Sequence, residues 1–303
     1  MATGSDSIRR ARPLLGTFVE IGVTGEAAFA MEAAVDAAFE AVANVHRLMS
    51  FHAADSDVSR LNRQAGLRPT RVHAWTFEVL EAAVEMHRRS NGIFDIAVAP
   101  TLQTMGLLPR SAGDPPIPSG PQLPDAIELF PGETVRFRSP DVRIDLGGIA
   151  KGFAVDRAVE ALRRFDVQSG IVNAGGDLAV FGRDPQMIHI RDPRDPGRPI
   201  CRVEITDGAI ASTARRFDPF RSSETTASAV VDPGTRKPTD TIDAATVRAP
   251  TCMVADALTK IVMISGTDAT EVLEHYNASA LLISTDGDVH ITLDWHHAVH
   301  LAA

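Results

Sequence analysis

The sequence is poor in cysteine, in long apolar stretches and in positive charge. Its 303 residues include two cysteines, Cys201 and Cys252. Neither belongs to a C-x-x-C or metal-ligand spacing, so we do not expect the fold to depend on disulfides. No apolar run reaches the roughly 18 residues that a membrane-spanning helix needs. The formal net charge of −9 also argues against a nucleic-acid partner, because such proteins present a basic face.

What is present is an ordinary globular composition, 44% hydrophobic and 23% charged, which can supply a large core. The first ten residues have no apolar signal segment and no lipid-anchor cysteine, so we expect a cytoplasmic protein, or a periplasmic one if a signal has been trimmed. Prolines crowd the stretch 107–124, which we interpret as an exposed, flexible loop. No internal period indicates a repeat architecture.

Hydrophobic spacing predicts a mixed α+β fold. Alternation predicts strands, and Asp286-Gly287 is typical of a hairpin turn. Apolar residues at helical spacing predict the helices. The main predicted helices are 26–49, 75–90, 150–165 and 255–264, and the strands that matter most below are 12–23, 142–145, 170–173 and 178–182.

Two glycine pairs carry the strongest functional signal. Gly147 and Gly148, the first glycine pair, follow an apolar run and precede Lys151 at the start of a predicted helix. Gly175 and Gly176, the second glycine pair, lie between the next two predicted strands. Glycine lets backbone N–H groups approach a ligand closely, and a helix N-terminus favours anions. The pattern favours a site for a phosphate-bearing cofactor, although both pairs are also compatible with ordinary tight turns and Lys151 with a solvated helix start.

Several further motifs occur in a characteristic order along the chain. Together with the glycine pairs they resemble the ApbE family of FAD:protein FMN transferases. The motifs that carry this resemblance are Leu15-Gly-Thr, Asp55-Ser-Asp-Val-Ser-Arg-Leu-Asn62, Gly92-Ile-Phe-Asp95, Asp145-Leu-Gly-Gly-Ile-Ala-Lys-Gly152, Asn173-Ala-Gly-Gly-Asp177, Asp232-Pro233 and Ala255-Asp-Ala-Leu258.

The resemblance implies one ApbE-like domain over residues 8–303, with two intertwined α+β subdomains of T-fold-like architecture and a flavin site between them. It implies that FAD is cleaved at its diphosphate with the help of Mg²⁺. FMN would then pass to a threonine or serine hydroxyl of an acceptor protein, and AMP would be released.

The resemblance also implies roles for individual residues. Lys151 and Asp256 would act in catalysis. Magnesium would be held by Asp256, by the main-chain oxygen of Ala150 and by Thr259, in keeping with the preference of Mg²⁺ for one or two carboxylates with phosphates and waters. The residues expected to bind the flavin nucleotide are Gly16, Thr17, Ser50, His52, Asp95, Gly147, Gly148, Lys151, Asn173, Gly175, Gly176 and Asp177.

The chain departs from the family pattern at the metal and acceptor end. Lys260 stands where a metal-holding threonine is usual, four residues after Asp256, and on a helix those two residues share a face. Either Lys260 replaces the charge of the metal or Thr259 takes over as ligand. Ala229 replaces a common histidine, and Ala214 replaces a glycine. These departures keep two alternatives open, a non-catalytic FAD-binding protein and an FAD pyrophosphatase.

The C-terminal histidines invite a second metal hypothesis. His296 and His300 have the i, i+4 spacing of helical metal ligands, but no carboxylate is placed to complete a set. We interpret the segment as a terminal polar element instead.

Overall fold

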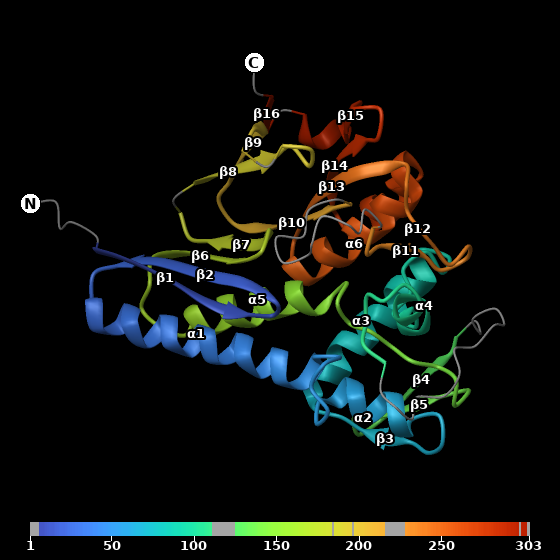
Figure 1. The fold of residues 1–303 in the computed structure, drawn as a ribbon. Helices are drawn as coiled ribbons and strands as arrows, with labels where there is room; N and C mark the ends of the chain where they lie inside the picture. Colours follow the sequence, from blue (N-terminus) through green and yellow to red (C-terminus); the bar gives the residue numbers. More distant parts are fainter. Residues whose placement is uncertain are drawn as a thin grey trace, which may run out of the picture.

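A computed structural model describes residues 6–110, 125–183, 185–195, 197–215, 228–296 and 298–301. Its centre is an antiparallel sheet of eight strands in the order β1-β2-β6-β7-β10-β13-β14-β15 (Figure 1). The strands are β1 (Asp6–Leu14), β2 (Thr17–Gly25), β6 (Ser169–Ala174), β7 (Asp177–Phe181), β10 (Gly208–Ala214), β13 (Ile242–Ala249), β14 (Ser279–Ser284) and β15 (Val289–Ile291).

Three helices pack on one face of this sheet and form the main core with it. They are α1 (Ala28–Met49), α5 (Ala150–Leu162) and α6 (Cys252–Ser265). The long apolar stripe of α1 lies under β1 and β2, while α5 and α6 lie side by side beneath the middle of the sheet (Figure 1). This arrangement confirms the α+β prediction and the existence of the 26–49 and 150–165 helices.

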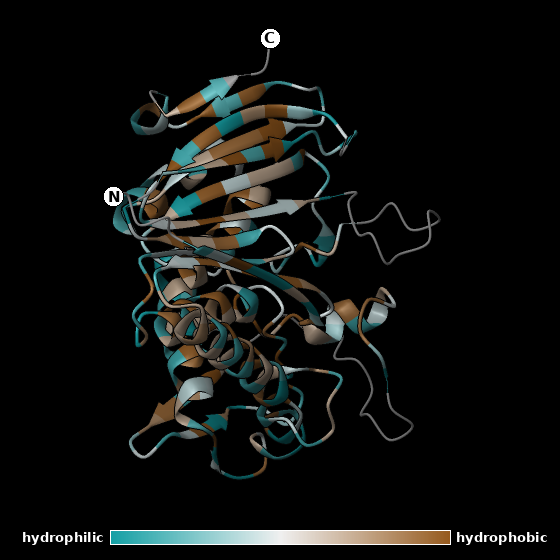
Figure 2. Ribbon diagram, turned by 90° about the vertical axis from the view of Figure 1, so that its left-hand side faces the viewer, coloured by the Kyte–Doolittle hydropathy of each residue, from teal (hydrophilic) through white to brown (hydrophobic). Residues whose placement is uncertain are grey.

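The other face of the sheet carries a second, smaller core under a three-stranded sheet of β8 (Gln186–Arg191), β9 (Pro199–Ile205) and β16 (Val299–Leu301). Successive residues of a strand point to opposite faces. Leu178 and Val180 therefore enter the smaller core, while Ala179 and Phe181 enter the main one. Figure 2 shows that hydrophobic and hydrophilic segments both occur along the strands of the molecule.

The remaining elements form the periphery, and Figure 1 shows α2, α3 and the small sheet β3-β5-β4 gathered at one end of α1. Their bounds are α2 (Asp57–Gln64), β3 (Thr70–Arg71), α3 (Ala74–Arg89), α4 (Ala99–Thr104), β4 (Ile127–Phe130), β5 (Thr134–Phe137), β11 (Val231–Asp232), β12 (Lys237–Pro238), η1 (Gly266–Ala269), α7 (Thr270–His275) and η2 (Leu293–Trp295).

The predicted single strand over 12–23 is wrong, because the chain reverses within it. Leu15 and Gly16 both have positive φ, 57° and 70°, and they link β1 to β2 as a two-residue hairpin with Leu14 opposite Thr17. Turns with two left-handed residues match the twist of paired strands. A leucine in that conformation is unusual, and here the Leu15 amide donates to His46 Nδ1 at 3.0 Å.

The predicted strand over 142–145 is wrong, because this segment forms no strand and pairs with none among the described residues. The side chain of Asn62 takes the place of a neighbouring strand. Its Nδ2 donates to the Ile144 carbonyl at 2.9 Å, and its Oδ1 accepts from the Ile144 amide at 2.8 Å. The Asn62 amide thus fixes the approach to the first glycine pair.

Helix α6 begins at Cys252, three residues before the predicted start. The carboxylate of Asp156 on α5 accepts from the amides of Cys252 and Met253, both at 2.8 Å. Thr251 adds a side-chain cap to the Val254 amide. Unpaired N–H groups at a helix start are satisfied in this way, and here they lock α5 to α6.

This contact makes stability depend on pH. Burial raises the pKa of Asp156 to about 6, and the two backbone amides offset only part of that effect. Since the unfolded pKa is about 3.9, the folded state binds more protons between pH 4 and 6, so the contribution of Asp156 to stability falls as pH rises through that window. Relative to Asp156→Asn, the wild-type free energy of unfolding should drop by roughly 2 kcal/mol from pH 4 to pH 7. Urea titrations of both proteins at several pH values measure this, and parallel profiles would contradict it.

At the C-terminus, the helical spacing of His296 and His300 does not place them on a helix. His296 follows η2, and its Nε2 faces the Ile291 carbonyl at 2.9 Å, while His300 pairs with Arg202 in the β16–β9 ladder. No helix within the described ranges is long and apolar enough to cross a membrane. Most of the proline-rich stretch, residues 111–124, lies outside those ranges.

Candidate functional site

The first glycine pair forms the turn that leads into α5. The Gly147 amide donates to Asp145 Oδ2 at 3.0 Å, and the Asp145 amide donates to the Ile96 carbonyl at 2.8 Å. Burial raises the pKa of the Asp145 carboxyl, and hydrogen bonds from the Gly147 and Leu146 amides to that carboxyl offset part of the rise. A Cβ added to Gly148 would meet nothing closer than Lys260 Cε at 3.5 Å. Gly148 therefore packs against the side chain of Lys260.

The second glycine pair is the two-residue turn between β6 and β7. Gly175 and Gly176 have φ of 66° and 102°, and Ala174 pairs with Asp177 across the turn. The Gly176 amide donates to Asn173 Oδ1 at 2.9 Å, so that amide is used within the turn. A Cβ on Gly175 would lie 2.5 Å from Thr17 Oγ1, which places the β1–β2 turn beside this pair.

Lys151 and Asp177 join the two glycine turns. The Lys151 ammonium pairs with Asp177 Oδ2, and Asp177 is fully buried while Lys151 is 31% exposed. Burial opposes the charged form of Lys151, but the carboxylates of Asp177 and Asp256 outweigh it and raise its pKa. The pKa of Asp177 is also raised, by burial and by the nearby Asp256. Asp177 Oδ1 is buried and has no hydrogen-bond partner among the described residues, so it can accept from a bound ligand.

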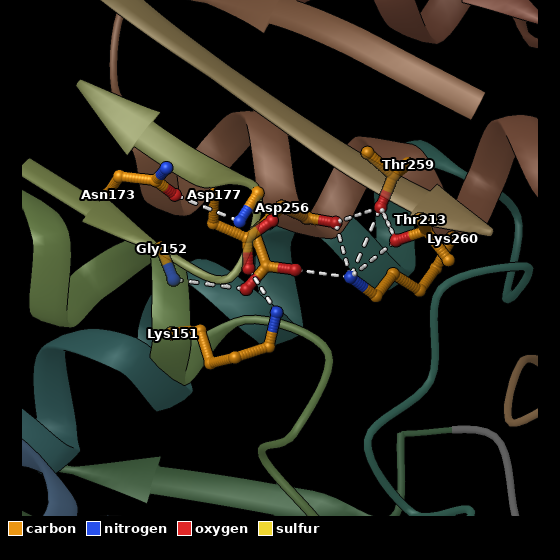
Figure 3. A network of polar contacts seen from close by, with 9 residues as sticks. Lys151, Gly152, Asn173, Asp177, Thr213, Asp256, Thr259 and Lys260 are labelled. Carbon is orange, nitrogen blue, oxygen red and sulfur yellow. Dashed lines mark hydrogen bonds and ion pairs between the residues drawn. The ribbon is translucent and has the colours of Figure 1, made fainter. Parts of the chain in front are cut away.

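Asp256, on α6, is the second buried carboxylate of this cluster. Its Oδ2 accepts from the Gly152 amide at 3.0 Å, and its Oδ1 pairs with the ammonium of Lys260. Burial favours the neutral acid, but Lys260 and then Lys151 outweigh it and hold the pKa of Asp256 below its usual value. The cluster therefore combines two carboxylates with two ammonium groups (Figure 3).

Lys260 lies in a shell of four oxygen atoms. Besides Asp256 Oδ1, its Nζ faces the Asp256 carbonyl at 3.0 Å, Thr259 Oγ1 at 3.1 Å and Thr213 Oγ1 at 3.3 Å. The hydroxyl of Thr259 also donates to the Asp256 carbonyl and lies 2.7 Å from Thr213 Oγ1. The shell has the donor types of a metal site, but its occupant is an ammonium.

These contacts do not suit a divalent cation. Both carboxylate oxygens of Asp256 are engaged, and the Thr259 hydroxyl is shared between Asp256, Thr213 and Lys260. A metal ion at these oxygens would lie beside the ammonium and be repelled by it. No group of three or more histidine, cysteine or acidic side chains among the described residues could hold a metal.

The other predicted binding residues make contacts of their own outside this cluster. Asp95 Oδ1 accepts from the Ala97 amide at 2.7 Å, one residue from the Ile96 carbonyl that holds the Asp145 loop. His52 is exposed, and its charge favours the ionised form of Asp145. Ser50 Oγ accepts from the His52 amide at 3.2 Å. Gly16 is exposed, and a Cβ there would meet nothing within 4 Å.

The sequence did not predict two groups that contact the cluster, the hydroxyl of Thr213 and the amide of Gly152. Thr213 lies on β10, which pairs with β7 in the sheet although β8 and β9 separate the two along the chain. Thr213 stands next to Ala214, where the chain departs from the family pattern, but the sequence predicted no role for it. Gly152 could have been found, because it ends the motif that begins at Asp145.

Comparisons with known proteins agree with this architecture. A crystal structure of the ApbE protein from Thermotoga maritima superposes with a TM-score of 0.85 at 24% identity, covering 97% of this chain and 99% of that one. The flavin transferase ApbE from Vibrio cholerae gives a TM-score of 0.81 at 23% identity, covering 97% and 100%. The chain therefore has the fold of these ApbE proteins.

The sequence comparisons are more specific. A model of the ApbE family matches residues 15–282, so the chain belongs to the ApbE family. The FAD:protein FMN transferase of Haemophilus influenzae is 29% identical over 264 residues, covering 80% of this chain and 76% of that protein. The enzyme of the same name from Vibrio cholerae is 27% identical over 257 residues, covering 80% and 77%.

Proposed function

We propose that this chain is an FAD:protein FMN transferase. The observation that carries the proposal is the cluster of Lys151, Asp177, Asp256 and Lys260 between two glycine turns, in a chain of the ApbE family. The position of Gly148 supports it, because an added Cβ there would contact the Lys260 side chain at 3.5 Å, so bare backbone lies beside a lysine. A backbone without side chains beside an ammonium suits a diphosphate.

The reaction exchanges one phosphoester bond for another. The acceptor threonine or serine oxygen bonds to the FMN phosphorus, the bond from that phosphorus to the bridging oxygen breaks, and AMP leaves. The hydroxyl proton passes to solvent or to the departing phosphate. Such transfers depend on alignment and on neutralising charge at the phosphates. We assign the neutralising role to Lys151, and we assign to the buried Asp177 and Asp256 the role of holding the lysine ammonium groups in place.

The remaining binding roles belong to the same proposal. The two glycine turns, with Asn173 and Thr17 bracing the second, would hold the nucleotide. Gly16, Ser50, His52 and Asp95 would line its approach. A magnesium ion at Asp256, Ala150 and Thr259 stays a prediction that the contacts of Lys260 do not favour, so no step above passes through one.

A single assay separates transfer from the other activities open to this fold. The protein is incubated with FAD, MgCl₂ and a library of peptides with a central threonine or serine. We expect equal amounts of AMP and of peptides carrying the mass of FMN, measured by chromatography and mass spectrometry. Free FMN with AMP would indicate a pyrophosphatase instead. Bound FAD that stays intact would reject catalysis.

A further inference from the structure

The Lys260 ammonium occupies the four-oxygen shell and supplies a positive charge beside the proposed diphosphate position. The shell combines a carboxylate oxygen, a main-chain carbonyl and two threonine hydroxyls, which are ligand types of a hard cation such as magnesium. An ammonium has three N–H donors, and all of them face protein oxygens here. Lys260 therefore acts as a fixed point charge rather than as a donor to a ligand.

The side chain of Lys260 also runs beneath the proposed diphosphate position. Gly148 lies directly against it, since the nearest atoms to an added Cβ there are Lys260 Cε at 3.5 Å and Cγ at 3.6 Å. The Lys260 side chain is 17% exposed. Its ammonium is therefore less solvated than the charge of a surface lysine. A charge in such surroundings is weakly screened.

Building on the proposed function, we propose that Lys260 is an internal replacement for the divalent cation, so that this chain binds and cleaves FAD without a metal. Lys151 and Lys260 approach the diphosphate from two sides, α5 and α6. The lysine and a metal ion compete for the same oxygens, so the site accepts one of them and not both.

The first test uses the wild-type protein. Mn²⁺ alone is titrated into it and followed by electron paramagnetic resonance. We expect the spectrum of free Mn²⁺ throughout. FAD affinity, measured by quenching of flavin fluorescence, should change by less than about twofold between EDTA and excess MgCl₂. Stoichiometric Mn²⁺ binding, or FAD affinity lost in EDTA, would overturn the inference.

The second test restores a hydroxyl at the shell. Lys260→Thr should gain Mn²⁺ binding, and its FAD affinity should become at least about tenfold weaker in EDTA than in MgCl₂. Lys237→Thr, the same change at an exposed lysine on β12, is the matched control and should behave as the wild type. If Lys260→Thr folds and remains indifferent to metal, the shell is not a cation site and the inference fails.

These outcomes are distinct from failure of the proposed function. If FAD binds but transfer products form only when a metal is added, the proposed transfer stands and only the role given to Lys260 is rejected. Absence of FAD binding under every condition would reject the proposed function itself. Should Lys260→Thr not fold, the wild-type titrations still decide the question.

Discussion

Replacing Lys151 by methionine should reduce flavin transfer by at least about 100-fold, the scale on which losing one stabilising group at a reacting centre acts. The reason is that the ammonium donates to Asp177 Oδ2 and also lies beside Asp256. The measurement is the rate of AMP release from FAD. Lys237→Met, at an exposed lysine, is the control for loss of a lysine elsewhere.

The same substitution should also destabilise the fold, and the two effects can be separated. Breaking a buried ion pair by removing one partner costs about 3–5 kcal/mol, because the other charge is left unpaired. Adding Asp177→Asn removes the stranded charge. The double variant should regain much of the lost stability, since coupled substitutions are not additive, but should not regain transfer. Recovery of transfer in the double variant would show that Lys151 acts only through folding.

Gly152→Ala should be the most damaging of the small substitutions available near the site. A Cβ there would lie 2.2 Å from the Cys252 carbonyl oxygen and 2.8 Å from Asp256 Cβ. Both belong to α6, so the helices must separate. Overpacking typically costs about 1–3 kcal/mol. Separating the helices also lengthens the hydrogen bond from the Gly152 amide to Asp256. We expect a lower melting temperature together with weaker FAD binding.

Gly148→Ala is the matched comparison, because its Cβ would make an ordinary contact of 3.5 Å with a flexible lysine. Its melting temperature should stay close to that of the wild type, with a change within about 0.5 kcal/mol in stability. Equal melting temperatures for Gly152→Ala and the wild type would mean that α5 and α6 are not held in contact through this glycine.

Much of the architecture could be predicted from the sequence because its signals are local. The helical spacing of α1 and α5, and the Asp286-Gly287 hairpin between β14 and β15, each depend on neighbouring residues only. Apart from the missed turn at Leu15 and Gly16, the errors came where a distant group intervenes. The Asn62 amide replaces a strand beside Ile144, and Asp156 on α5 lengthens α6 at its start. Nothing in the local pattern shows either partner.

The candidate site divides in the same way. The two glycine turns and Lys151 are visible as motifs, and the i, i+4 spacing places Lys260 beside Asp256. The pairing of Lys151 with Asp177 and the arrival of Thr213 at the shell depend on how β7, β10 and the two helices pack. Side-chain spacing within one element can be read along the chain, whereas contacts between elements require the assembled sheet.

The chain contains three lysines, Lys151, Lys237 and Lys260, and its other fixed cations are arginines. Two of the three meet in one buried cluster, where a compact ammonium fits between oxygens and a broad planar guanidinium does not. Reagents that label primary amines therefore react with few other side chains, since Lys237 is the one lysine outside this site. Protection of Lys151 from such labelling offers a direct, residue-level signal of whether a ligand is in place.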